Sequence, residues 1–321
     1  MDWLNDIANL TNSTFVFTTA LIFGAMGGLF SERSGVFNIG LEGMMTGGAF
    51  GAAIGAYYAE QSGLTSSAPW LGILAGIACS VVFALLLAYT TVTLKANQAI
   101  VGVVINILAV AVTLYLVKVI FNGAGDTDTL NNVLDKWAIP VLSDIPFFGK
   151  ALFNTYPTTY MAYLLVPISA YVLYKTPFGL RLRSVGEHPG AADTVGINVI
   201  KYRYIGVILS GVLAGIGGAT ITLTTTANFS HTTVSGQGFI ALAAMIFGRW
   251  NPWGVLGATF FFGMAQALRN FVKLYDWSKD IPMEFLYMLP YVLTLLVLAG
   301  AVGKGVKGPA AAGEAYDPSK R

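Results

Sequence analysis

Long apolar runs with few charges constrain the fold of this chain more than any other feature. Hydrophobic residues make up 55% of its 321 residues and charged residues only 11%, whereas charged residues make up about 25% of an ordinary globular domain. A helix of about 20 apolar residues crosses the roughly 30 Å of hydrocarbon in a bilayer. We therefore predict an all-α, polytopic transmembrane helix bundle of about nine spans, at residues 14–30, 36–58, 70–94, 98–121, 157–174, 204–224, 239–247, 252–271 and 285–302.

The seventh run, 239–247, is too short to span a bilayer alone. It therefore either begins earlier than its apolar residues suggest or belongs to a broken or re-entrant segment. The spans form one transmembrane domain over residues 1–303. We expect the remaining residues, 304–321, to be a disordered cytoplasmic tail.

The distribution of Lys and Arg predicts which side of the membrane each loop faces, since short cytoplasmic loops carry an excess of both. An odd number of spans puts the two termini on opposite sides. With the C-terminus in the cytoplasm, twelve of the 18 basic residues lie inside and six outside, and the inverted arrangement reverses this bias. We expect an external N-terminus, an external loop at 122–156 and a cytoplasmic loop at 175–203.

Glycine is patterned along the second run as well as abundant. Gly43, Gly47, Gly51 and Gly55 recur every four residues, which places them on one face of a helix. Lipid supplies no hydrophobic drive between helices, so small residues that let backbones approach closely hold such bundles together. The pattern predicts a tightly packed helix.

Polar side chains inside or at the ends of the predicted spans need a hydrogen-bonding partner or a watery passage. They either bond neighbouring helices and cap helix ends, or line a translocation pathway for a small uncharged polar solute. Glu42 is the only acidic residue well inside a predicted span, so the series of buried carboxylates that ion coupling requires is missing from the sequence. The candidate pathway residues are Asn38, Glu42, Asn97, Gln98, Asn106 and Thr222.

The sequence offers no catalytic or metal-binding pattern. It has two histidines and one cysteine, with neither an HExxH motif nor a Cys/His cluster. The GKGVKG stretch at 303–308 lacks the spacing of a phosphate-binding P-loop. A net charge of +2 is too small to suggest nucleic acid as a partner. A membrane-embedded enzyme and a stand-alone secondary transporter both remain alternatives without a visible site.

The basic loop at 175–203 contains a turn followed by a short helix, from Pro189 to Val195. Pro189 suits the first position of a helix, and Gly196 suits the residue just past its end. A short helix between turns is a rigid projection that fits the groove of a partner protein. The alternative is an ordinary connecting loop anchored by basic residues.

Four segments resemble a known family. They are ERSGVFNIGLEGMM at 32–45, KANQ at 95–98 together with Asn106, the loop at 178–199, and GFIALAAMIFGRWNPWG at 238–254. Together they resemble the permease subunits of ATP-binding-cassette (ABC) importers for simple sugars, nucleosides and branched-chain amino acids. The likeness is greatest to the nucleoside branch, which works with a lipoprotein binding component.

The resemblance implies a multi-pass permease of the bacterial cytoplasmic membrane. Its partners would be a second homologous permease, a cytoplasmic ABC ATPase, and an extracellular or lipoprotein substrate-binding protein. ATP and Mg would be bound by the ATPase, with no cofactor in this chain, which is then not itself an enzyme. The solute would be a nucleoside, with a simple sugar or riboflavin as alternatives.

The resemblance also implies a coupling role for the loop, whose residues 186–192 would sit in a groove of the ATPase. His188 stands where the family pattern has asparagine, and both side chains can hydrogen-bond at a turn. The expected coupling residues are Arg181, Arg183, Gly186, Glu187, His188, Pro189, Ala191, Ala192, Gly196 and Ile197.

Overall fold

The computed structural model describes residues 2–140, 142–143, 145, 148–272, 288, 292 and 308–317, and it is mostly helical. The long helices are α1 (Asp2–Arg33), α2 (Leu41–Gln61), α3 (Ala68–Ala88), α4 (Gln98–Ile120), α6 (Pro157–Lys175), α9 (Val199–Ile221) and α11 (Pro252–Val272). The short ones are α5 (Phe148–Leu152), α7 (Pro177–Glu187), α8 (Pro189–Thr194) and α10 (Gln237–Phe247). A 3-10 turn (η1, Thr65–Ser67), two π-helical turns (η2, Tyr89–Thr93, and η3, Thr222–Thr226) and an antiparallel strand pair (β1, Trp137–Ala138, and β2, Asn154–Thr155) complete the elements.

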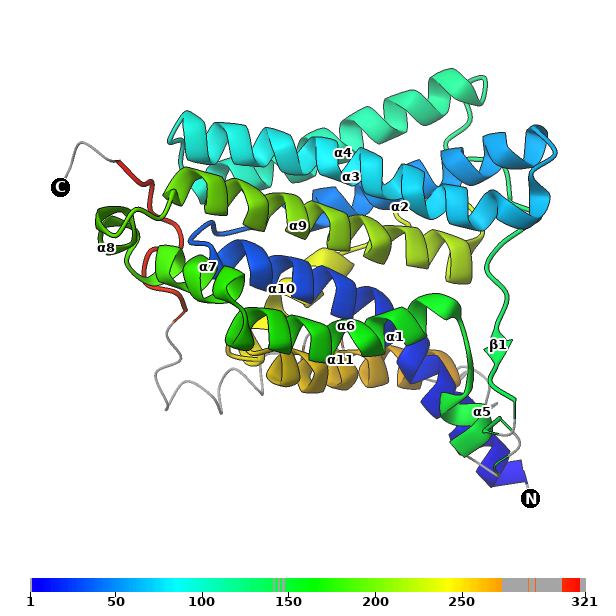
Figure 1. Cartoon of the computed structure of the whole chain (residues 1–321). Coiled ribbons are helices and arrows are strands. Elements are labelled where there is room, and N and C mark those ends of the chain that lie inside the picture. Colours follow the sequence, from blue (N-terminus) through cyan, green and yellow to red (C-terminus); the bar gives the residue numbers. More distant parts are fainter. Residues whose placement is uncertain are drawn as a thin grey trace.

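The long helices lie side by side, so their connections gather at two opposite ends of the bundle (Figure 1). One end, which we call the α8 end, holds α7, α8, the turn between α10 and α11, and residues 308–317. The other end holds the start of α1 and the long loop after α4. Eight of the nine expected runs correspond to helices, while the ninth, 285–302, lies outside the described residues apart from 288 and 292.

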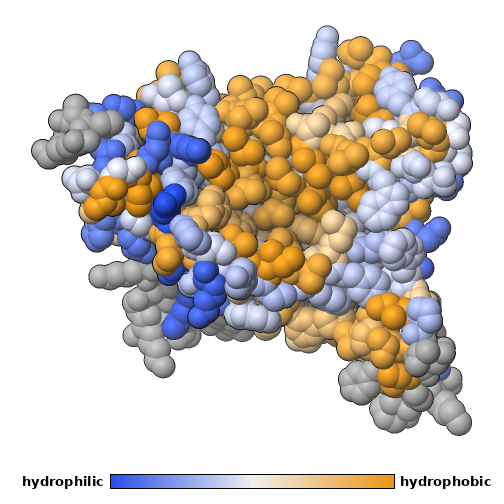
Figure 2. Space-filling model, in the orientation of Figure 1, coloured by the Kyte–Doolittle hydropathy of each residue, from blue (hydrophilic) through white to orange (hydrophobic). Residues whose placement is uncertain are grey.

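An apolar surface covers the middle of one face of the bundle (Figure 2). Figure 2 shows hydrophobic side chains covering the centre of one face, with hydrophilic ones gathered around α7 and α8. Within the described part of the chain, four helices are long and apolar enough to cross a membrane: Asn5–Arg33, Thr65–Thr93, Gln98–Ile120 and Val199–Thr226. α4 exposes large apolar side chains such as Ile100, Ile107 and Tyr115. These surfaces suit contact with lipid.

α2 is the most enclosed of the long helices, which explains why its composition differs from that of a lipid-facing span. Its glycines allow backbone contact: a Cβ on Gly48 would lie 2.6 Å from the carbonyl oxygen of Gly215. A Cβ on Gly51 would lie 2.7 Å from the carbonyl oxygen of Ala75. Real side chains could not occupy those spaces. The prediction of tight packing along this helix is therefore confirmed.

The loop after α4 folds back over the bundle. Its backbone N–H groups at Thr127, Leu130 and Leu134 donate to the carbonyl oxygens of residues 229, 227 and 223, at distances of 2.8–3.0 Å. α1 begins earlier than expected, because Asn12 bonds the carbonyl oxygen of Asn154 at 3.0 Å and so packs the helix start against this loop. Contacts between residues so far apart in the chain produce no periodic pattern in the sequence, so the sequence could not predict them.

α10 explains the short seventh run. It has 11 residues, so it is about 16 Å long at 1.5 Å per residue, or half of a bilayer crossing. The chain leaves α9 and η3, returns through residues 227–236, and starts α10 partway along the bundle. The prediction that this run is too short to span alone is confirmed: the helix starts at Gln237, and irregular backbone precedes it.

Candidate functional site

The short helix at the α8 end forms for local reasons. Pro189 occupies its first turn, where a missing N–H costs nothing. Gly196 has a φ of +81°, and its N–H donates to Asp193 while the N–H of Ile197 donates to Ala192. This pair of bonds is the Schellman arrangement that ends a helix. The predicted short helix between turns is therefore present.

The ten expected coupling residues divide into an exposed and a packed set. Ala192 is buried against Val185 and Val199, and Ile197 covers the same cluster. Arg183 lies over the ring of Tyr174, with its guanidinium carbon 4.9 Å from the ring centre. The exposed members are Arg181, Glu187, His188, Ala191 and Gly196, whereas Pro189 is half-buried and Gly186 is buried.

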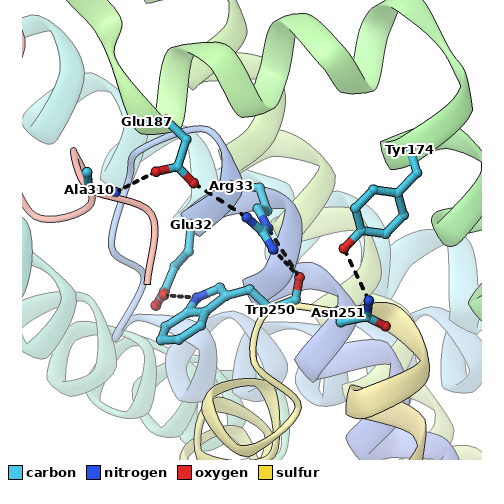
Figure 3. A network of polar contacts seen from close by, with 7 residues as sticks. All are labelled: Glu32, Arg33, Tyr174, Glu187, Trp250, Asn251 and Ala310. Carbon is cyan, nitrogen blue, oxygen red and sulfur yellow. Dashed lines mark hydrogen bonds and ion pairs between the residues drawn. The ribbon is translucent and has the colours of Figure 1, made fainter. Parts of the chain in front are cut away.

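Three of the four segments that carry the family resemblance meet at this end, although they lie far apart in the sequence (Figure 3). Arg33, the last residue of α1, donates to the carbonyl oxygen of Trp250 at 3.1 and 2.7 Å. The same guanidinium lies 3.6 Å from the carboxylate of Glu187, the last residue of α7. One side chain thus joins α1, α7 and the α10–α11 turn.

The α10–α11 turn adopts a backbone conformation that needs such support. Arg249 and Trp250 have φ values of +54° and +51°, in the left-handed region that side chains other than glycine rarely occupy. The indole N–H of Trp250 donates to the buried carboxylate of Glu32 at 2.6 Å. Glu32 and Arg33 therefore hold the side chain and the carbonyl of the same tryptophan.

Gly186 sets the distance between α7 and α1. A Cβ at this position would lie 2.3 Å from the carbonyl oxygen of Arg33, closer than any real Cβ contact. The glycine lets the end of α7, just before α8, rest directly on the end of α1. A direct backbone contact therefore joins the residues just before α8 to the end of α1.

Residues 308–317, which we call the C-terminal segment, pack against this end. The N–H of Ala311 donates to the carbonyl oxygen of Gly186 at 2.9 Å. The carbonyl oxygen of Glu314 accepts from the almost fully buried Arg203 at 2.8 Å, and Lys95 pairs with Asp317 at 2.9 Å. The expectation of a disordered tail at 304–321 does not describe these residues, because buried polar groups of the bundle bond their backbone.

A cavity of about 240 Å³ lies toward the opposite end of the bundle, where η3 closes α9. Amide and hydroxyl side chains dominate its lining, and one charged residue, Arg269, is among the described lining residues. Its walls come from α1, the α9–η3 segment, the loop before α10, and α11. The lining residues are Val16, Phe17, Ala20, Thr220, Ile221, Thr224, Thr225, Thr226, Thr233, Val234, Ser235, Gln237, Gln266, Arg269 and Asn270.

Two glutamines pair in this lining. The amide nitrogen of Gln237 donates to the carbonyl oxygen of Gln266 at 2.9 Å, and the reverse bond measures 3.1 Å. Gln237 opens α10 and Gln266 lies on α11, so the pair connects two helices at the cavity wall. The π-helical turn η3 presents the neighbouring threonines, and such turns occur frequently at functional sites.

α10 links the cavity to the α8 end. At its start, the carboxylate of Glu42 accepts from the N–H groups of Gly236 and Gly238, both at 2.7 Å. These N–H groups belong to the free donors at a helix start, where negative charge is favourable. At its other end, α10 leads into the turn held by Glu32 and Arg33. A single short helix therefore joins the two regions.

The six candidate pathway residues all have protein partners, and none lines the cavity. Asn38 donates to Ser210 at 2.8 Å, and Asn106 accepts from the N–H of Gly43 at 2.8 Å. Asn97 caps the start of α4, which was one of the two alternatives that the sequence left open. The remaining three, Gln98, Glu42 and Thr222, bond Phe37, the start of α10 and the carbonyl of Ala49 respectively. Their lining of a pathway stays a prediction.

Sequence reasoning missed the two glutamines. A signal was present, because Gln266 and Asn270 lie four residues apart on one face of a helix within an apolar run. The threonine cluster at 220–226 is the complementary signal. Their proximity could not be seen, because the two segments meet only through the return of the chain into α10.

Comparison with known proteins gives a consistent result. Residues 10–298 match the family described as "Branched-chain amino acid transport system / permease component". The guanosine ABC transporter permease protein NupQ of Bacillus subtilis is 47% identical, and the nucleoside ABC transporter permease protein NupC of Lactococcus lactis is 43% identical, each over 100% of both chains. The putative glucose ABC transporter permease TsgC13 of Haloferax volcanii is 35% identical over 92% of both. A solved inward-facing metal-chelate type ABC transporter aligns at 17% identity with a TM-score of 0.47, too low to identify the fold.

Proposed function

This chain belongs to the branched-chain amino acid transport system / permease component family, so it is a multi-pass membrane subunit of an ABC transporter, and we propose that its solute is a nucleoside. The ATP-hydrolysing subunit of such a transporter is a separate protein. The family resemblance stated from the sequence agrees with this match over most of the chain.

Two lines of support favour a nucleoside. The relatives named for guanosine and nucleosides share 47% and 43% of their residues with this chain over their full length. The cavity offers amides for a base, hydroxyls for a ribose and the ring of Phe17 for a flat face. A simple sugar is the second candidate, because the glucose-named relative is 35% identical. Riboflavin is a third, and no contact in the cavity favours it over a nucleoside.

The α8 end is proposed to face the cytoplasm and the start of α1 to face outward. Basic residues support this placement, since Lys95, Arg181 and Lys201 all lie at or next to the α8 end, and cytoplasmic loops are enriched in such residues. The proposal includes nine spans in the membrane of a bacterial cell. It also includes a second homologous permease, an ABC ATPase, and an extracellular or lipoprotein binding protein as partners.

Coupling to the ATPase is proposed to start at the exposed side of α8. Val195, just past α8, is 74% exposed, and Ala191 and His188 are also exposed, so this side is open to a partner. Movement of α8 passes through the contact of Gly186 with Arg33 and then through Trp250 into α10. Because α10 begins at the cavity wall, the same movement changes the wall, as alternating access requires. The continuous contacts from Gly186 through Arg33 and Trp250 to α10 are the observation that supports the coupling proposal.

Four of the six polar residues predicted for the pathway take a supporting place in this proposal. Glu42 fixes the start of α10, and Thr222 bonds η3 to α2. Both lie directly behind the cavity wall. Asn38 and Asn106 join α2 and the residues before it to α9 and α4, so they hold the helices between which a solute would pass.

The test is reconstitution in liposomes. The chain with its partner permease, ATPase and binding protein should accumulate radiolabelled guanosine in an ATP-dependent way, and the chain alone should show neither uptake nor ATP hydrolysis. Uptake by the chain alone would identify a secondary transporter. ATP-driven uptake of glucose, but not of guanosine, would replace the nucleoside with a sugar.

A further inference from the structure

We propose that Gln266 recognises the base of the solute through two hydrogen bonds, and that Gln237 occupies this position when no solute is bound. The inference rests on the proposed function, because it concerns the same cavity and assumes a nucleoside. It adds an assignment that neither the motifs nor the relatives provide. It starts from the paired amides in the cavity wall.

The chemistry of the pair makes an exchange possible. A glutamine amide has one carbonyl acceptor next to its N–H donors. A nucleobase edge, such as N1–H beside O6 in guanine, has the same adjacent donor and acceptor. A base can therefore replace one amide of the pair and form the same two bonds with the other. No buried polar group loses its partner in the exchange, which matters because such a loss is costly.

Burial indicates which glutamine stays. Gln266 is 2% exposed and lies on α11, so its amide needs a partner at all times. Gln237 is half-buried at the first position of α10, where its side chain can turn to water. We therefore assign base recognition to Gln266, with Gln237 as the partner that the base displaces.

The rest of the cavity fits the remaining parts of a nucleoside. Thr220 and Thr224 donate their hydroxyl protons to carbonyl oxygens four residues earlier, at 2.8 and 2.7 Å. The Thr224 oxygen also lies 3.2 Å from the Thr225 hydroxyl, but a hydroxyl oxygen has two lone pairs, so each threonine can still accept from a ribose hydroxyl. Phe17 supplies an aromatic face, and stacking on such a face is favourable for every base.

The exchange has a structural consequence. The amide pair bonds the start of α10 to α11. A bound base removes this connection and leaves the start of α10 held by Glu42. Solute binding would thus loosen α10 from α11, at the helix that leads to the α8 end.

The experiment compares guanosine with 1-methylguanosine, which lacks N1–H, in the complete transporter reconstituted with its own binding protein. Wild type should take up guanosine at least about tenfold faster, the value of one hydrogen bond. Gln266→Met should reduce this ratio by about tenfold relative to wild type, whereas Gln237→Met should keep the ratio and leave the KM for guanosine equal or lower. Because all variants use the same binding protein, its own preference cancels from the comparison.

The outcomes separate the two levels of the proposal. If wild type accumulates guanosine but Gln266→Met keeps the wild-type ratio, the base-recognition assignment is overturned and the nucleoside function stands. If both glutamine variants lose the ratio equally, the pair acts as a helix-to-helix bond and the assignment to Gln266 is also overturned. If wild type takes up no nucleoside, the proposed function itself fails. Membrane yield and thermal stability of each variant, measured in parallel, identify loss of folding, and Gln266→Glu, of nearly the same shape, then serves as the second variant.

Discussion

The turn after α10 and the cavity wall at its start are held by contacts of different kinds. At the Trp250 end, the carboxylate of Glu32 and the guanidinium of Arg33 hold a backbone turn in a left-handed conformation. At the Gln237 end, the carboxylate of Glu42 holds the backbone of α10 from one side. On the cavity side, the uncharged amides of Gln237 and Gln266 pair with each other. Charged bonds to a strained turn fix one geometry, whereas neutral amides can exchange one partner for another at little cost. In our proposal, the turn after α10 transmits movement from α8, and the amide pair at its start responds to the solute.

The largest effect is expected from a substitution that releases the Trp250 turn. Arg33→Ala removes both donors to the carbonyl of Trp250 and the ion pair with Glu187. Hydrogen bonds to a charged group are worth about 1.5–3 kcal/mol each, so we expect solute-stimulated ATP hydrolysis by the full transporter to fall on the order of 100-fold.

The matched control is Lys201→Ala, since Lys201 is an exposed cation at the same end whose described contact is made by its backbone. We expect it to hydrolyse ATP at close to the wild-type rate. Equal activity of the two variants would show that the Trp250 turn keeps its geometry without Arg33, and that the contrast between the ends of α10 does not hold.

A smaller effect is expected from crowding the cavity end. In Gly238→Ala, the new Cβ would lie 2.5 Å from the backbone of Glu42, so α10 has to move away from α2. Overpacking of this kind costs about 1–3 kcal/mol, and we expect uptake to fall about tenfold. Gly257→Ala is the control, because no atom of the described residues lies within 4 Å of its new Cβ. A thermal shift assay on the purified transporter should show the same order, and similar melting temperatures for both variants would argue against close packing of α10 on α2.

The smallest effect is expected at Glu187. Its side chain is 46% exposed and 3.6 Å from Arg33, and exposed ion pairs contribute about 0–1 kcal/mol. We therefore expect Glu187→Gln to lower ATP hydrolysis by about threefold or less. A loss of ATP hydrolysis as large as that of Arg33→Ala would mean that Glu187 contacts the ATPase directly. The charged residues at the α8 end would then bind the ATPase rather than only support the Trp250 turn.

Local features of the fold could be predicted from the sequence, while the connections between them could not. The apolar runs predicted eight of the helices, and Pro189 and Gly196 predicted the short helix between them. The partner of Glu42 lies 194 residues away in the chain. Neither the periodicity nor the composition of the sequence predicts a contact over such a separation. The C-terminal segment was missed for the same reason, since its polar, glycine-rich composition resembles a disordered tail until buried Arg203 is seen to bond it.

The candidate site shows the same division. The motif at 32–45 and the loop at 178–199 were visible as separate segments, and the fold brings Arg33 within bonding distance of Glu187. The cavity depends on where the chain turns back after η3, and this turn is set by the bonds of the loop at 127–134 to residues 223–229. Gln237 and Gln266 therefore became candidates only when their shared wall was known.

The packing of the C-terminal segment also bears on the order of synthesis. A ribosome releases residues 308–317 after every helix of the described bundle, yet these residues bond Gly186, Gln98 and Arg203. The surface around α8 is therefore incomplete while translation continues, even if the earlier helices have already inserted. A chain that ends before residue 308 would lack these bonds, so the surface that we propose for the ATPase would be unfinished in it.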